Sequence, residues 1–141
     1  MEDKYDWKLT DRLQAEHGRG DPFAAAVRAT RMPMVVTDPS QPDNPIVFVN
    51  EAFQELTGYT REECLGRNCR FLQGKDTEPA TVSQIRHAVE HGKDISADIL
   101  NYRKDGTSFW NALYLSPVRG GNGDIQSYFA SQLVVTQRID A

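Results

Sequence analysis

The nonapeptide GRNCRFLQG, at residues 66–74, gathers an unusual set of reactive and polar side chains in this 141-residue chain. It carries one thiol, two guanidinium groups and two carboxamides, and its apolar pair, Phe71 and Leu72, can anchor the segment in a core. Cys69 is followed directly by Arg70, on what we expect to be a short turn of helix bounded by glycines. A thiol beside a guanidinium group suits a ligand that combines an electrophilic ring with a phosphate. The nonapeptide is therefore the predicted centre of a binding site.

The chain on both sides of the nonapeptide predicts an α+β fold built on one antiparallel sheet. Two short apolar strands come first, separated by a proline-rich loop that cannot continue a strand ladder. Helices with recognisable capping residues follow, and three longer strands joined by glycine-containing turns complete the chain. This order places the helices between strands two and three of a sheet of about five strands. The expected elements are strands at 34–37 and 46–49, short helices after Asn50 and Thr60, a helix at 80–91, and strands at 94–103, 107–118 and 125–136.

The rest of the chain divides into one main domain and two flanking segments. Residues 22–137 form the expected domain, which begins with a helix at 22–31. Residues 1–21 are an N-terminal flanking segment, polar but with apolar residues at helical spacing, and we expect a weakly amphipathic helix there. Residues 138–141 are the expected start of a C-terminal connector. Flanking helices of this kind predict a homodimer.

Composition narrows the classes of partner. The net charge of −4 argues against nucleic acid, and no stretch is apolar enough for a signal peptide or a membrane span, so we expect a cytoplasmic protein. Cys64 and Cys69 match neither a disulfide framework nor a zinc pattern, and Cys64 is interpreted as a packing residue. His87 and His91 lie one helical turn apart with no third ligand nearby, so no metal site is expected.

Three amides in the C-terminal strands indicate a bound ligand independently of the nonapeptide. Strand residues alternate between faces, so Asn101, Asn111 and Gln132 each fall among apolar or small residues on one face of their strand. A buried amide without a partner costs about 1–3 kcal/mol. The three could pair with one another or with the backbone, but together they favour a ligand whose edge alternates hydrogen-bond donors and acceptors.

The nonapeptide, together with these amides, resembles the LOV (light-oxygen-voltage) branch of the PAS superfamily over residues 22–137. The resemblance implies a PAS fold and a blue-light photoreceptor domain that binds FMN. Cys69 is implied to form a reversible adduct with flavin carbon C4a after illumination. Protonation of flavin N5 would then require the Gln132 amide to rotate, which would pass the signal through the last strand to flanking helices and an effector.

The resemblance also implies a role for each residue around the flavin. Asn101 and Asn111 match amides at the pyrimidine end of the ring, and Gln132 matches the glutamine near N5 and O4. Asn68 and Gln73 correspond to contacts with the ribityl chain and the ring. Arg70 and Arg86 match phosphate ligands, which favours FMN over FAD because two guanidinium forks suit a terminal monophosphate. The apolar residues expected to crowd the ring are Leu113, Leu115 and Phe129.

The effector is expected to be a histidine kinase domain or a separate partner protein, and the domain itself is expected to be a sensor and not an enzyme. Two alternatives come from other classes of function. One is a flavin-dependent redox enzyme, which would need room for a substrate over the flavin. The other is a PAS module without photochemistry, which would serve in dimerisation or would bind another ligand such as haem.

Overall fold

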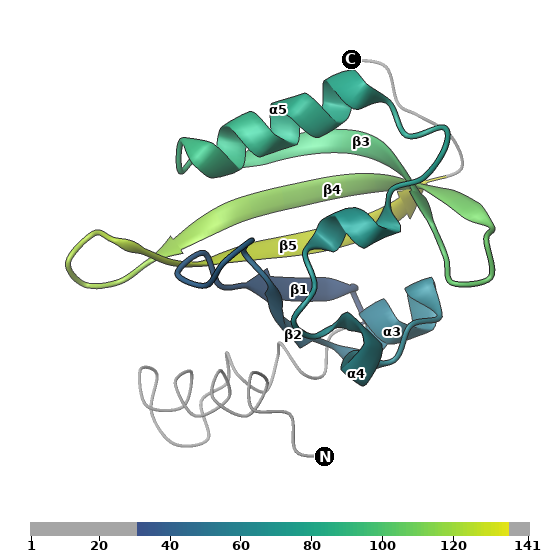
Figure 1. Ribbon diagram of the computed structural model, residues 1–141, viewed down its shortest axis with the longest axis horizontal. Helices are drawn as coiled ribbons and strands as arrows, with labels where there is room; N and C mark the ends of the chain where they lie inside the picture. The colour runs from purple at the N-terminus through teal and green to yellow at the C-terminus, as the bar shows by residue number, and fades with distance from the viewer. Residues whose placement is uncertain (1–30, 136–141) are drawn as a thin grey trace.

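The computed structural model describes residues 31–135, which form a five-stranded antiparallel sheet with the order β2-β1-β5-β4-β3. Figure 1 shows the helices gathered over one face of this sheet, with α5 running alongside β3. The predicted α+β arrangement, with helices between the second and third strands, is confirmed. The elements in chain order are β1 (Met34–Thr37), β2 (Ile46–Val49), α3 (Glu51–Thr57), α4 (Arg61–Cys64), the 3-10 helix η1 (Cys69–Leu72), α5 (Pro79–Glu90), β3 (Ile95–Tyr102), β4 (Ser108–Arg119) and β5 (Ile125–Val135).

The predicted elements outside residues 31–135 are not described by the structure. They are the helix expected in the segment 1–21, the helix expected at 22–31 except for Arg31, and the connector at 138–141. Within the described range, both short strands have the expected bounds, and the longer elements differ from expectation by one residue at one or both ends. Such differences are ordinary, because helix and strand ends depend on contacts that local sequence does not specify.

The long strand β4 pairs with β3 on one side and with β5 on the other, and this double pairing fixes which side chains face the helices. Asn111 lies opposite Ile99 of β3, and Leu113 lies opposite Gln132 of β5. Because side chains alternate along a strand, one residue of slip would turn every one of them to the other face. The register therefore sets the composition of the inner face of the sheet.

Local capping explains why the short helices begin and end where they do. Thr60 and Glu63 form a complete capping box at the start of α4, as the sequence predicts. Gly58 ends α3 with a φ of 80°, a left-handed conformation that glycine adopts without steric cost. After α4, backbone hydrogen bonds of Gly66 and Arg67 with Ile46 of β2, at 2.9 and 2.8 Å, place the start of the nonapeptide against the first strands.

Asn50 joins α3 to the first strand. Its side-chain oxygen accepts hydrogen bonds from the backbone of Phe53, at 3.0 Å, and of Met34, at 2.9 Å. Its amide nitrogen donates to the oxygen of Met32 at 2.8 Å. The residue is 3% exposed, and its bond to Phe53 is buried while those to Met34 and Met32 are partly buried. Asn50 thus caps a helix and fixes the entry of the chain into β1.

We expect Asn50→Ala to lower the free energy of unfolding by about 2–3 kcal/mol, because it removes a helix cap and leaves two further backbone groups without partners. Urea denaturation followed by circular dichroism measures the change. Asn122→Ala, in the exposed β4–β5 turn, is the matched control and should alter the unfolding free energy by less than about 0.5 kcal/mol. Equal losses in the two variants would contradict this role for Asn50.

Candidate functional site

A cavity of about 470 Å³ lies between the inner face of the sheet and the helices, and it is lined by the β1–β2 loop, η1, α5 and strands β1, β3, β4 and β5. Its size is in the range of pockets that hold a cofactor or a drug-sized ligand. The nonapeptide supplies Asn68, Cys69, Arg70, Leu72 and Gln73 to its wall. The structure therefore places the predicted centre of the site directly against an internal space.

The three strand amides meet at this cavity and are almost fully buried: Asn101 is 5% exposed, Asn111 1% and Gln132 3%. Asn111 donates through its amide nitrogen to the side-chain oxygen of Asn101 at 3.0 Å, so part of the set pairs internally. The side-chain oxygens of Asn111 and Gln132 have no partner among the described residues. Internal pairing thus satisfies one amide oxygen and leaves two that require a donor from a ligand or water.

The 3-10 helix η1 holds Cys69 at its first position. Asn68 caps this helix, because its side-chain oxygen accepts from the backbone of Arg70 at 3.0 Å. Leu72 is buried in the main core, and Phe71 packs against that core with its ring edge-on to Tyr59, the two ring centres being 4.9 Å apart. The apolar pair anchors the segment as the sequence predicts. The Cys69 thiol is thus held on a short, well-packed turn.

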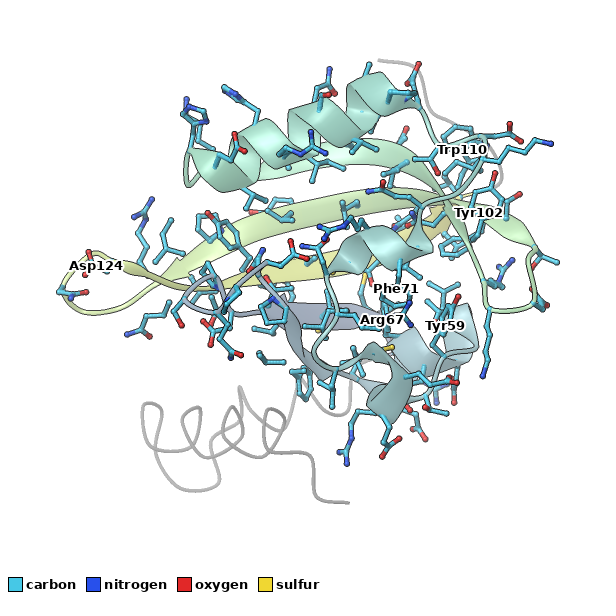
Figure 2. All side chains as sticks on the ribbon, viewed as in Figure 1. Tyr59, Arg67, Phe71, Tyr102, Trp110 and Asp124 are labelled. Carbon is cyan, nitrogen blue, oxygen red and sulfur yellow. The ribbon has the colours of Figure 1, made fainter. Side chains whose placement is uncertain are left out.

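The two arginines of the nonapeptide, Arg67 and Arg70, have different surroundings. Its guanidinium carbon lies 4.2 Å from the centre of the Phe71 ring, a cation–π contact, and Figure 2 shows it grouped with Tyr59 and Phe71. Arg67 therefore covers the outer side of η1, while Arg70 lines the cavity.

Cys69 packs against the main core and lines the cavity. Burial raises the pKa of its thiol to about 12, because a thiolate would be poorly solvated there. At neutral pH the group is thus a protonated thiol and a weak nucleophile towards ordinary electrophiles. Cys64 is fully buried in the same core, where burial raises its pKa to about 11, in keeping with its interpretation as a packing residue.

The two arginines expected to bind phosphate both line the cavity, Arg70 from η1 and Arg86 from α5. Arg70 is already paired with the carboxylate of Asp43, through one bond of 3.1 Å to its Nη1 and a second, close contact to its Nη2. This hydrogen-bonded carboxylate raises the pKa of the Arg70 guanidinium. Two cationic groups from separate elements thus converge on one cavity, one of them with an anionic partner.

Among the predicted apolar contacts, Leu113 and Leu115 line the cavity and Phe129 does not. The expectation for Phe129 needs correction, because its neighbours Tyr128 and Ala130 both line the cavity and side chains alternate along β5. Phe129 pairs with Val36 of β1 and Ser116 of β4, and its side chain therefore belongs to the other face of the sheet.

Sequence reasoning missed the contribution of β1 and of the loop that follows it. Thr37, Asp43 and Asn44 all line the cavity, and the side-chain oxygens of Thr37 and Asn44 are buried without a partner in the described part of the chain. Strand alternation, which puts Thr37 on the same face as the buried Val35, could have identified Thr37. The loop residues offer no such periodic signal.

Residues 31–135 contain neither a cluster of metal-binding side chains nor a helix that could span a membrane. No group of three or more His, Cys, Asp or Glu side chains is placed to hold a metal ion, and His87 and His91 stack with ring centres 4.0 Å apart. None of the helices described there has the length and apolarity that crossing a membrane requires.

Comparison with known proteins identifies the family. The model of a PAS domain family matches residues 31–135. A solved structure described as "Flavin Analogue Sheds Light on Light-Oxygen-Voltage Domain Mechanism" is 44% identical, has a TM-score of 0.78, and covers 82% of this chain and 85% of its own. The chain belongs to the PAS family and is a LOV domain. It is a blue-light photoreceptor domain of the type found in blue-light-activated histidine kinases.

Two further relatives support the same family assignment. The blue-light-activated histidine kinase of Brucella ovis is 56% identical over 116 residues, which is 82% of this chain and 24% of that protein. The LOV domain of the Erythrobacter litoralis EL346 blue-light-activated histidine kinase is 37% identical with a TM-score of 0.72, over 75% of this chain and 97% of that structure. This LOV domain therefore spans about a quarter of the length of the curated kinases that it matches.

We expect Gln132→Leu to raise the unfolding free energy of the flavin-free LOV domain by about 1 kcal/mol, because it replaces a buried oxygen that has no partner with an apolar group of similar size. The measurement is urea denaturation in the absence of flavin. Gln126→Leu, on the exposed part of the same strand, is the matched control and should change stability by less than about 0.5 kcal/mol. A marked loss of stability in Gln132→Leu would show that the amide is satisfied within the protein.

Proposed function

We propose that this LOV domain binds FMN in the cavity and uses the Cys69 thiol as the group that bonds reversibly to the flavin ring under blue light. The observation that carries the proposal is the meeting of Cys69 with three buried amides around one cavity, where two of the amide oxygens lack a partner among the described residues. An apolar ligand would leave these oxygens unsatisfied. A flavin ring offers N–H and acceptor groups along the same edge.

The donor set of the cavity fits the parts of FMN. Asn101 and Asn111 would hold the pyrimidine edge of the ring, and Leu113 and Leu115 would pack on its faces. Asn68 and Gln73, at the two ends of η1, would contact the ribityl chain and the ring. Arg70 and Arg86 would bind the phosphate, because guanidinium forks donate two directed hydrogen bonds to phosphate oxygens. Two such forks favour a terminal monophosphate, and hence FMN over FAD.

The chemistry divides between the cofactor and the chain. A bound flavin supplies absorption of blue light and a ring carbon, C4a, that can accept a thiol. Cys69 supplies sulfur and proton together, because burial keeps its thiol protonated at neutral pH. This protonation state also keeps the thiol unreactive in the dark. Light dependence thus comes from the flavin, and the protonated thiol limits reaction in the dark.

Gln132 is the proposed relay. Its side chain can present either an oxygen or an NH₂ group to the ring, so it can follow a change from acceptor to donor at flavin N5. Its backbone nitrogen donates to the oxygen of Pro33 at 3.0 Å, just before β1 begins. Gln132 therefore couples the cavity both to the end of β5 and to the point where the chain enters the sheet.

This position suits output through the flanking segments 1–21 and 138–141. By analogy with the relatives, the effector is a histidine kinase domain of a longer protein, or else a separate partner, and the sensor works as a homodimer through its flanking helices. The domain itself acts as a sensor and not as an enzyme. Two unpaired thiols suit a reducing compartment, so we place the protein in the cytoplasm.

The central test is Cys69→Ala, followed by absorption spectroscopy before and after a blue flash. The unaltered chain should show structured flavin bands that bleach and return in the dark. Cys69→Ala should bind flavin to a similar extent and show no reversible bleaching, because the amides and arginines remain and the thiol is gone. Cys64→Ala is the matched control, and it should bleach normally.

Each result has a distinct meaning. Full reversible bleaching in Cys69→Ala would contradict the role of the thiol. Flavin bands that persist under light in the unaltered chain would favour a flavin-dependent redox enzyme, and a colourless chain that takes up no flavin would favour a PAS module without photochemistry.

A further inference from the structure

The β1–β2 loop delivers a carboxylate to the residues proposed to bind the flavin tail. Asp43 forms a two-point ion pair with Arg70, and its backbone oxygen accepts from the Asn68 side chain at 2.7 Å. Asp43 lines the same cavity as Arg70 and Arg86. One loop residue thus occupies hydrogen-bonding positions on two proposed ligands of FMN.

The local structure holds this carboxylate in place. Asp43 and Asn44 have φ values of 69° and 49°, in the left-handed region that few residues other than glycine, asparagine and aspartate adopt. Backbone bonds from Asp38 to Pro45, at 3.0 Å, and from Asn44 to Gln41, at 3.2 Å, close the loop around them. The Asp43–Arg70 pair is therefore built on a defined turn and not on two freely moving side chains.

A carboxylate and a phosphate use the same edge of a guanidinium group, since each accepts two parallel N–H bonds. The Asp43 carboxylate engages both Nη atoms of Arg70, so a phosphate must displace it or bind the remaining N–H groups beside a negative charge. Either route makes the binding free energy of a phosphate less favourable. An uncharged flavin tail does not incur this cost. Riboflavin, which ends in a hydroxyl group, leaves the pair intact.

We propose that Asp43 is a specificity residue that opposes the phosphate of FMN at Arg70 and so narrows the preference of this site for FMN over riboflavin. The inference rests on the proposed flavin site and adds a regulatory element to it: the β1–β2 loop competes with the ligand for the cation on η1. Since the Asp43 and Arg70 side chains are 57% and 58% exposed, solvent screens the effect, which we expect to be modest.

The test is a competition between the two flavins. The full chain is equilibrated in the dark with an equimolar excess of FMN and riboflavin at low ionic strength, then desalted, and the retained flavins are separated and quantified. Asp43→Asn should raise the retained ratio of FMN to riboflavin about fivefold, because it removes one nearby charge and keeps an oxygen for Arg70. Asparagine also tolerates the left-handed backbone.

Two further variants support the comparison. Asp124→Asn, in the β4–β5 turn at the far end of the sheet in Figure 2, changes the net charge equally and should leave the ratio unchanged. Asp43→Gly accepts the same backbone conformation and should raise the ratio as Asp43→Asn does. At about 1 M salt, where the Debye length is ~3 Å, the increase should fall below about twofold.

The outcomes separate this inference from the function on which it rests. An unchanged ratio in both Asp43 variants would overturn the inference, and so would a lower ratio, which would mean that Asp43 holds Arg70 in place for the phosphate. An equal increase in Asp124→Asn would reduce the effect to net charge and overturn it as well. Failure of the unaltered chain to retain either flavin would instead reject the proposed flavin site.

Discussion

The pairing of β4 with both of its neighbours is the constraint on which the site depends. Its register with β3 and β5 decides that Asn111, Leu113 and Leu115 face the helices, and it brings Asn101 and Gln132 to the same wall. Backbone hydrogen bonds on both sides make this register costly to shift, because a slip would exchange an entire face. Strand pairing therefore fixes the sheet side of the site, whereas the rest of the lining includes shorter elements such as η1 and the β1–β2 loop.

The inner face of the same sheet also lowers the stability of the domain, because some of its buried polar atoms have no partner among the described residues. Buried oxygens of Thr37, Asn111 and Gln132 lack partners, and each such group lowers stability by about 1–3 kcal/mol relative to a satisfied one. A ligand that supplies donors to them gains affinity and stabilises the fold in the same contacts. Folding and the proposed binding of flavin are thus linked through the polar atoms of the inner face. This linkage explains why amides, which are poor core residues, occupy positions where leucine would give a more stable empty domain.

Most of the fold could be predicted from the sequence because its determinants are local. Capping residues such as Asn50 and Thr60, the glycine turns, and the alternation of the long strands all act over a few residues. Alternation also predicted the convergence of the three amides, and the structure brings them to one cavity. The same rule, applied consistently, would have excluded Phe129 from the residues expected to line the cavity.

The parts that could not be predicted depend on contacts between residues distant in sequence. Asp43 and Arg70 are 27 positions apart, and nothing in the proline-rich loop indicates that it turns back onto the nonapeptide. The stacking of Arg67 on Phe71 is local but equally hard to foresee, because two arginines three residues apart in one motif have no sequence feature that separates a covering role from a cavity role.

Gln132 shows how the rigid sheet and the proposed switch can coexist. Its backbone pairs with β4 on one side and donates to Pro33 on the other, so hydrogen bonds on both sides hold the register of the strand. The side chain, by contrast, has an oxygen without a partner and an amide group that can present either polar end to the ring. A rotation of that side chain changes the hydrogen bonding of the cavity while the register stays fixed. In the proposed switch, that change would be passed on at the ends of the two strands, which are Val135 for β5 and the entry at Pro33 for β1. From both points the chain continues towards its two ends, so the proposed signal would leave the sheet towards the flanking segments.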